Sequence, residues 1–384
     1  MRHRVHSWPS VCRVALFAMT HHVYLVPGFF GFTNLGRLRY FLHVHDALRR
    51  RGLRVHVVRT HPTASLPRRA ARIAETIADT LPRGGVAHLV GHSTGGLDAR
   101  LFATPGVTLP TAADADHFAA RLGAIVTVAS PHHGAPLASA LSSVRGQQLI
   151  AMLSLGTSYV LRFGHLPLSA VLQIGALFRG ATPPDGQGTL LDDLTRQLLT
   201  DFSIGRRRAV QRLLGEVVRD QSLLPQLAPE AMEVFNATVH DRPGVRYGAV
   251  VTRARPPGIR STLATGLDPG AQAMHGIYQA IYRLSSTTRR GGEAPLTRAQ
   301  RRALHLAYGR VPRSRANDGI VPTRSQVWGT VVAAVDADHL DVIGHFNAPR
   351  SRPPHYDWLT TGSGFDVATF ERVWDRVVAF LTRG

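Results

Sequence analysis

The segment Val86-Ala87-His88-Leu89-Val90-Gly91-His92-Ser93-Thr94-Gly95 decides the fold of this chain. Its first five residues form an apolar run typical of a buried strand, and residues 95–102 continue with helical spacing. Between them, Gly91 to Gly95 have the spacing Gly-x-Ser-x-Gly. Such a turn needs glycine on both sides, because side chains there would collide with the strand and the helix. The segment therefore predicts a nucleophilic Ser93 at the carboxyl edge of a sheet, with a plain strand-to-helix turn as the alternative.

Apolar runs elsewhere in the chain alternate with helical patterns, which predicts an α/β fold with a mostly parallel sheet flanked by helices. The predicted strands are residues 22–26, 53–58, 86–90, 122–129, 245–252 and 330–335. The predicted helices are residues 38–48, 68–81, 271–284, 296–308 and 370–381, besides the one after Ser93.

The alternation of strands and helices breaks down twice, which predicts helical cap insertions at about residues 135–239 and 256–315 of a single domain spanning residues 20–384. Within the first insertion, residues 146–178 carry only one charged side chain. This stretch is an extra pair of core helices, a loosely packed cap helix, or a mobile lid whose apolar underside faces a greasy substrate. Residues 1–19 are predicted to be a dispensable extension.

Composition limits the possible classes of protein. With 44% hydrophobic residues in 384, a large core is expected and disorder is not. Cys12 is the sole cysteine, so no intramolecular disulfide can form. This fits a reducing compartment or a protein whose core needs no disulfide, and we expect a cytoplasmic protein, with secretion as the alternative. Arg13 interrupts the short apolar stretch at residues 11–19, which argues against a signal peptide, and no run is long enough for a transmembrane segment.

The net charge of +20 comes from 45 arginines and no lysine. A nucleic-acid partner is the functional interpretation of such a charge. However, the arginines are scattered along the chain and no nucleic-acid-binding motif accompanies them. We therefore expect no nucleic-acid partner, and the sequence leaves the oligomeric state open.

A nucleophilic serine needs a histidine as base and an acid that orients this histidine. In parallel sheets that carry a nucleophilic serine on a Gly-x-Ser-x-Gly turn, the chain order is serine, acid, histidine, and both partners lie in loops after later strands. Asp318 lies in Asn-Asp-Gly downstream of the strand at 245–252, and His339 directly follows the strand at 330–335. An isolated Asn-Asp-Gly favours a type I′ turn. Given Ser93 and His339 in order, we predict Asp318 as the acid and His339 as the base.

Several other residues compete for these roles. The other candidate bases are His132, His133, His345 and His355. The first two precede any acid, and the last two lie further from a strand end, so all four are expected to be structural or solvated. Asp338 and Asp341 are too close to His339 in sequence to orient its ring easily.

Two backbone N–H groups are needed to hold the oxyanion that forms during acyl transfer. One is expected from Thr94, the residue after the nucleophile. The other is expected from Phe29, in the glycine-containing loop at residues 26–32 after the first strand. The alternative is that Pro27-Gly28 merely ends a strand.

Taken in order along the chain, five patches resemble bacterial triacylglycerol lipases and related esterases of the α/β-hydrolase fold. These patches are residues 25–32, 89–100, 129–134, 317–322 and 338–341. The resemblance implies the same roles for the serine, acid, base and oxyanion residues named above, and a lid within residues 135–239.

The chain departs from this family in three respects. Pro27-Gly28 stands where the family usually has His-Gly, and the disulfide of many secreted relatives is impossible. Asp341 matches a calcium-ligand position in some of these lipases, but its distant carboxylate partner is not identified by any motif. We therefore expect no cofactor for the chemistry and leave calcium open.

These residues predict a serine carboxylic-ester hydrolase, a lipase or esterase that cleaves small-molecule esters or lipids with hydrophobic acyl groups through an acyl-enzyme on Ser93. An acyltransferase would use the same acyl-enzyme with an alcohol as acceptor. A non-catalytic lipid- or nucleic-acid-binding protein of the same fold is the third possibility.

Overall fold

A computed structural model describes residues 20–29, 40–142, 155, 159, 167–178, 190–264, 269–287, 295–352, 354–355, 357 and 361–383. The predicted extension at residues 1–19, residues 30–32 of the oxyanion loop and most of the charge-poor stretch at residues 146–178 lie outside this part of the chain.

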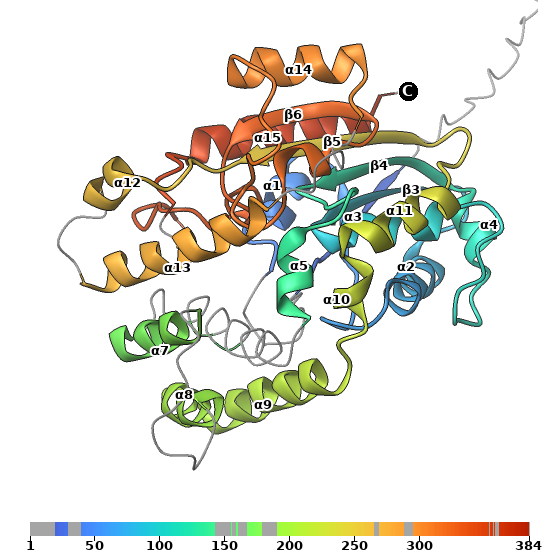
Figure 1. Ribbon diagram of the computed structural model, residues 1–384. Coiled ribbons are helices and arrows are strands. Elements are labelled where there is room, and N and C mark those ends of the chain that lie inside the picture. The colour runs from blue at the N-terminus through green and yellow to red at the C-terminus, as the bar shows by residue number, and fades with distance from the viewer. Residues whose placement is uncertain are drawn as a thin grey trace, which may run out of the picture.

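Six strands form one parallel sheet in the order β2-β1-β3-β4-β5-β6 (Figure 1). The strands are β1 (His21–Val26), β2 (Arg54–Val57), β3 (Val86–His92), β4 (Leu122–Val128), β5 (Arg246–Arg253) and β6 (Thr330–Asp336). Each of the six strands was predicted from sequence, with ends within two residues of those observed.

The strand order reverses between β1 and β3. The chain runs outward from β1 to β2, then returns to place β3 on the other side of β1. In open parallel sheets such a reversal leaves a crevice at the carboxyl ends of the two strands, where ligands bind. The loop that begins with Pro27 and the turn at Ser93 follow these two strands, so the sheet order alone brings them to one place.

Helices cover both faces of the sheet (Figure 1). Helices α1 (Val44–Arg50) and α15 (Val367–Leu381) pack on one face, in a cluster that centres on the fully buried Trp374. On the other face, α2 (Leu66–Thr80) and α3 (Thr94–Ala103) pack on β1, β3 and β4, while α14 (Arg298–Tyr308) covers β5 and β6. Alternate strand residues face each layer, which is why the strands read as continuous apolar runs.

The predicted helix at residues 38–48 was wrong at its start. Tyr40 to Leu42 form a turn, His43 adopts a left-handed conformation with φ 61°, and the helix begins only at Val44. A residue in that conformation interrupts the helical backbone, so it separates the turn from α1.

The described parts of the two predicted cap insertions, residues 135–239 and 256–315, are largely helical. They contain α5 (Pro136–Leu141), α7 (Leu168–Phe178), α8 (Leu190–Leu199), α9 (Ile204–Arg219), α10 (Leu223–Gln226), α11 (Pro229–Thr238), α12 (Ile259–Ala264) and α13 (Pro269–Ser285). The second insertion also contains α14, which packs on the sheet and is not part of a cap. We call α5 and α7 to α13 the cap. In Figure 1, α7, α8 and α9 lie at the end of the molecule away from the sheet, and α13 packs on both α7 and α5.

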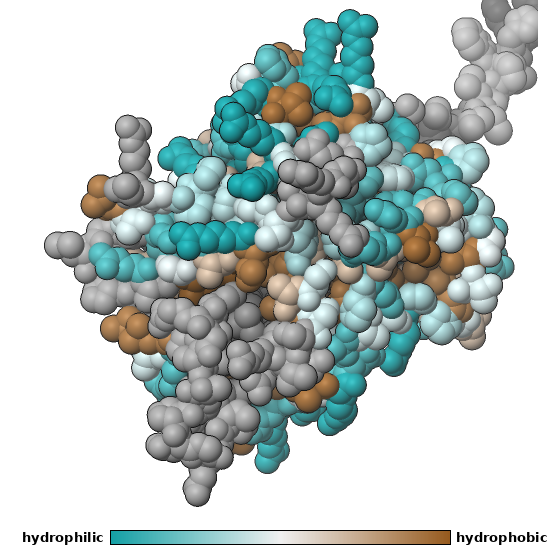
Figure 2. Space-filling view, viewed as in Figure 1, coloured by the Kyte–Doolittle hydropathy of each residue, from teal (hydrophilic) through white to brown (hydrophobic). Residues whose placement is uncertain are grey.

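An apolar cluster holds the cap together. It includes Leu141, Val171, Leu213, Ile277 and Ile281. On the face shown in Figure 2, apolar side chains gather in a band across the middle of the molecule, at the level of α13 and α5. No helix among the described residues has both the length and the apolar composition needed to cross a membrane.

Two helical glycines allow a matched test of how closely α3 packs on β1. At Gly95 in α3, an added Cβ would lie 2.2 Å from the Val26 carbonyl oxygen, whereas at Gly276 in α13 it would meet nothing within 4 Å. We expect Gly95→Ala to lower the free energy of unfolding by about 1–3 kcal/mol. Gly276→Ala is expected to raise it by up to about 1 kcal/mol, because alanine favours helix. Urea unfolding midpoints measure both, and equal effects would contradict the close approach of α3 to β1.

Candidate active site

The Ser93 turn is strained and closely held. Ser93 has φ 54° and ψ −128°, a conformation that side-chain-bearing residues rarely adopt. Its N–H donates to the Val128 carbonyl of the neighbouring strand at 2.8 Å. An added Cβ on Gly91 would lie 2.3 Å from the Gly95 carbonyl oxygen, so glycine is required where strand and helix meet. The predicted strand, turn and helix are all present, and the turn presents Ser93 at the carboxyl edge of the sheet.

The loop after β1 lies directly against this turn. An ideal Cβ placed on Gly28 would be only 2.5 Å from the Ser93 Cβ. Phe29 follows Gly28 and is partly buried against the cap, and Thr94 begins α3. Both residues predicted for the oxyanion hole therefore flank Ser93, and the use of their N–H groups stays a prediction.

Asp318 and His339, predicted as acid and base, are hydrogen-bonded to each other. His339 Nδ1 lies 2.8 Å from Asp318 Oδ2, and the His339 N–H donates to the Asp318 carbonyl at 3.0 Å. The other carboxylate oxygen, Oδ1, accepts from the N–H groups of Ile320 and Val321 at 3.0 and 2.7 Å. Because a carboxylate only accepts, His339 carries its proton on Nδ1, which leaves Nε2 free to act as a base.

A line of hydrogen bonds connects three loops of the site. The Gly28 N–H donates to the Tyr40 hydroxyl at 3.1 Å, and this hydroxyl lies 2.6 Å from His92 Nδ1. His92 Nε2 lies 2.8 Å from the His339 carbonyl oxygen and donates to it. Burial lowers the pKa of His92 well below its ordinary value, so its ring is neutral and holds a single proton on Nε2. His92 directly precedes Ser93, so its Nε2 hydrogen bond connects the Ser93 turn to the backbone of His339.

An ion pair fixes the loop after β1 to the helix that follows Ser93. Arg69 and Asp98 are both fully buried, and Arg69 Nη2 lies 2.8 Å from Asp98 Oδ2. The same Nη2 donates to the Pro27 carbonyl at 2.7 Å. Removing one partner of such a pair typically costs about 3–5 kcal/mol.

Four of these residues, Arg69, His92, Tyr40 and Asp98, were not predicted from the sequence. Arg69 interrupts the apolar face of a predicted helix, and a buried arginine there could have been suspected. His92 lies inside the Gly-x-Ser-x-Gly motif, but the motif leaves that position free. No sequence signal marks Tyr40, and Asp98 reads as an ordinary helical polar residue.

The competing histidines have partners elsewhere. His132 Nε2 lies 3.0 Å from the Thr127 hydroxyl, His345 donates to the Tyr40 carbonyl at 2.9 Å, and His355 donates to the Gly344 carbonyl at 2.6 Å. Burial lowers the pKa of His133, His345 and His355 to about 4 each. Within the described residues the Ser93 hydroxyl makes no hydrogen bond, so its bond to His339 stays a prediction.

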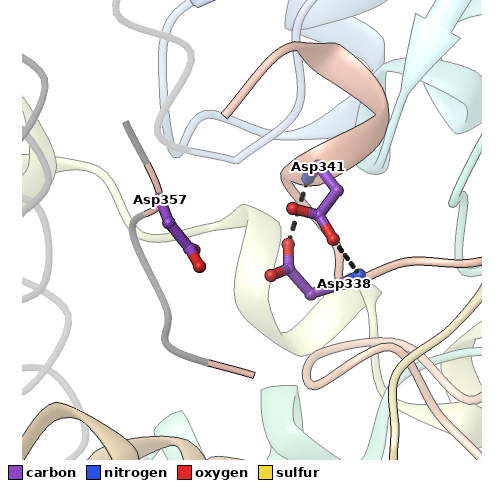
Figure 3. Close-up of side chains that lie close together, drawn as sticks. All are labelled: Asp338, Asp341 and Asp357. Carbon is purple, nitrogen blue, oxygen red and sulfur yellow. Dashed lines mark hydrogen bonds between the residues drawn. The ribbon is translucent and has the colours of Figure 1, made fainter. Parts of the chain in front are cut away.

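Three carboxylates beside His339 could hold a metal ion. Oxygens of Asp338, Asp341 and Asp357 lie within 4.8 Å of one another (Figure 3). No motif in the sequence points to Asp357, and its place beside Asp341 makes it a candidate for the carboxylate partner that the sequence did not identify. The N–H of Asp338 donates to Asp341 Oδ2 at 2.8 Å, and the N–H of Asp341 donates to Asp338 Oδ1 at 3.0 Å. Burial raises the pKa of Asp338 to about 7 and raises that of Asp341 well above its usual range.

This donor set fits a hard cation such as Ca²⁺, which binds carboxylate oxygens. Such an ion would also relieve the repulsion between buried carboxylates. Part of the set is already bonded within the protein, since Thr361 donates to Asp338 and Ser363 donates to Asp341.

No protein-family model matches the sequence, and no curated protein sequence is significantly similar to it. Solved structures do resemble it. A metagenomic carboxyl esterase matches with a TM-score of 0.51 at 20% identity, over 95% of this chain and 76% of that one. Lipase 1 from Pelosinus fermentans matches with a TM-score of 0.52 at 16% identity, over 94% and 98% of the two chains. The Staphylococcus hyicus lipase matches with a TM-score of 0.51 at 15% identity, over 94% and 95%. At these identities the likeness shows the fold, which is the predicted α/β-hydrolase fold.

Calcium at the three carboxylates stays a proposal, and its test is a thermal melt. We expect millimolar Ca²⁺ to raise the melting temperature of the protein, and a chelator to reverse the effect, because an ion that binds only the folded state stabilises it. Asp357→Asn should abolish the response. The matched control is Asp366→Asn, an aspartate that caps α15 outside the cluster. If melts of the unaltered protein do not respond to Ca²⁺, then the three carboxylates form a hydrogen-bonded cluster and no metal site.

Proposed function

We propose that this protein is a serine carboxylic-ester hydrolase of the lipase and esterase type, acting through an acyl-enzyme on Ser93. The observation that carries the proposal is the buried Asp318–His339 hydrogen bond at the same sheet edge as the strained Ser93 turn. His92 connects the two directly, since it precedes Ser93 and bonds to the His339 carbonyl. The solved structures with this fold include two lipases and a carboxyl esterase, which supports the same class of reaction.

In the proposed mechanism the Ser93 oxygen attacks the ester carbonyl while His339 Nε2 takes the hydroxyl proton. Asp318 keeps the ring in the required tautomer and balances the imidazolium charge. The N–H groups of Phe29 and Thr94 hold the oxyanion of the tetrahedral intermediate. His339 then gives its proton to the leaving alcohol, and water, activated by the same ring, releases the acid. This chemistry uses no cofactor.

The surroundings of the site favour a hydrophobic acyl group. Three of its loops each send one partly buried apolar side chain into the cap cluster, namely Phe29 after β1, Ile320 near Asp318 and Leu340 beside His339. A substrate that enters between these loops and the cap meets apolar surface. Transfer of an acyl chain from water to such a surface stabilises the complex by about 0.8 kcal/mol for each buried CH₂. We therefore propose small-molecule esters or lipids as substrates.

Covalent labelling tests the nucleophile. A fluorophosphonate probe is expected to modify Ser93, and intact-mass and peptide analysis should find one adduct there. Ser93→Ala should abolish labelling and reduce ester hydrolysis by about 10⁶-fold, as in other triads. Ser130→Ala is the matched control, because Ser130 is a buried serine that follows the neighbouring strand β4. Labelling that survives Ser93→Ala would rule out the assignment.

A series of p-nitrophenyl esters of increasing chain length tests the acyl group. We expect kcat/KM to rise from acetate to longer acyl chains, because each added CH₂ is transferred from water to apolar surface. Product analysis in the presence of a competing alcohol separates hydrolysis from acyl transfer, and free acid should dominate. Highest activity on the acetate, with a fall at every longer chain, would contradict the hydrophobic acyl site.

A further inference from the structure

Thr252 and Gln326 enclose the side of the Asp318 carboxylate that faces His339. Thr252 lies on β5, and Gln326 ends the 3-10 helix η1 (Thr323–Gln326). The Thr252 hydroxyl donates to Asp318 Oδ2 at 2.8 Å, and Gln326 Nε2 donates to the same oxygen at 3.1 Å. This oxygen is the one that bonds His339 Nδ1. All four side chains are buried.

The hydrogen-bond network fixes the orientation of the Gln326 amide. Its Nε2 faces acceptors only, namely Asp318 Oδ2 and the carbonyl oxygens of Val321 and Thr252 at 3.2 Å each. Its Oε1 faces the N–H of Thr252 at 2.7 Å and the Thr252 hydroxyl at 3.0 Å, both of which can donate. The reverse orientation would set an acceptor against three acceptors, so only this one satisfies the amide. The Thr252 hydroxyl has one proton, and the shorter contact directs it to Asp318.

These contacts supply hydrogen bonds to a carboxylate that is fully buried. Asp318 accepts five hydrogen bonds from the described residues, two at Oδ1 from backbone N–H groups and three at Oδ2. The backbone pair holds Oδ1 but leaves Oδ2 free to move about that anchor. Thr252 and Gln326 approach Oδ2 from β5 and η1, so they hold it where His339 Nδ1 can reach it.

We propose that Gln326 and Thr252 are positioning residues of the active site: they hold the Asp318 carboxylate aligned on His339, and thereby set the rate of acyl transfer. This inference rests on the proposed function. Neither residue touches Ser93 or a substrate in this arrangement, so their effect passes through Asp318. A residue that acts this way should change kcat and leave KM, because the His339 imidazolium forms only as the reaction proceeds.

The test compares near-isosteric variants by kcat for each titrated active site. Gln326→Met keeps the length of the side chain and removes both the NH₂ and the carbonyl oxygen of its amide. Thr252→Val keeps the branched shape and removes the hydroxyl. Each is expected to lower kcat by about 10- to 100-fold with KM within about twofold, as expected for a lost hydrogen bond to a charged group. Thr252→Ser restores the hydroxyl and should recover most of the loss.

Ser325→Ala is the matched control on the same 3-10 helix. The Ser325 hydroxyl bonds the His133 N–H and the Gly134 carbonyl, and the residue is buried like Gln326. Its loss should leave kcat within about twofold of the unaltered enzyme, since it makes no contact with Asp318. Active-site titration with the fluorophosphonate and a thermal melt of every variant separate loss of folded enzyme from loss of rate.

The outcomes distinguish this inference from the proposed function. If the unaltered protein neither hydrolyses esters nor labels at Ser93, the proposed function fails. If it does both, but folded Gln326→Met and Thr252→Val keep kcat within twofold, the positioning role is overturned. Should Gln326→Met fail to fold, Thr252→Val against Thr252→Ser decides the question, because both keep the backbone bonds of Thr252 to Gln326. A loss in Ser325→Ala equal to that in Gln326→Met would reduce the effect to general packing of η1 and would also overturn the inference.

Discussion

The contact between the loop after β1 and the turn after β3 is the constraint on which the rest of the site depends. Gly28 abuts Ser93, Gly91 abuts Gly95, and Gly95 abuts the Val26 carbonyl, so three glycines allow two strands and one helix to meet without side chains between them. This proximity forces Ser93 into its unusual backbone conformation. A strained residue persists only where its surroundings over-determine it. Here the parallel pairing of β1 with β3 and of β3 with β4 supplies that support.

Buried polar groups fix the positions of the loops of the site more closely than apolar packing does. The Arg69–Asp98 pair reaches the Pro27 carbonyl and fixes the loop after β1 to α3. Tyr40 and His92 extend a second connection from the same loop to His339. Hydrogen bonds have preferred directions and dispersion contacts have none, so these groups set distances within the site to a few tenths of an ångström. The sheet thus brings the loops together, and the buried polar network sets how they face one another.

The sequence predicted the framework of the fold because its signals are local. The six strands lie in mostly apolar runs bounded by turn residues, and Ser93 and His339 closely follow two of them. Asp318 lies far beyond the end of β5, and it was predicted from its Asn-Asp-Gly sequence and its order between Ser93 and His339. Tyr40 and Gln326 could not be predicted from the sequence. Tyr40 acts through His92, which lies 52 residues away along the chain. Gln326 lies in a short 3-10 helix, which shows no hydrophobic periodicity. Asp357 also lacks a signal, since only the tertiary fold brings it near Asp338 and Asp341. The start of α1 was missed because a left-handed His43 leaves no compositional mark.

The cap and the sheet domain meet where the chemistry is proposed to occur. Phe29, Ile320 and Leu340 belong to loops anchored in the sheet, yet their side chains pack into the apolar cluster of the cap. Any movement of the cap must therefore change the surroundings of all three loops together, since a closely packed interior transmits displacement. The Asp318 side chain accepts hydrogen bonds from β5, from η1, from His339 and from the backbone of its own loop, and His92 bonds the His339 carbonyl. The cap helix α13 is bonded to the same loop, since Ser285 donates to the Gly319 carbonyl at 3.0 Å and Asn317 donates to the Tyr282 carbonyl at 3.2 Å. The cap is therefore coupled to the loop of the acid as well as to the surroundings of Ser93, while β5 and η1 hold the Asp318 carboxylate itself.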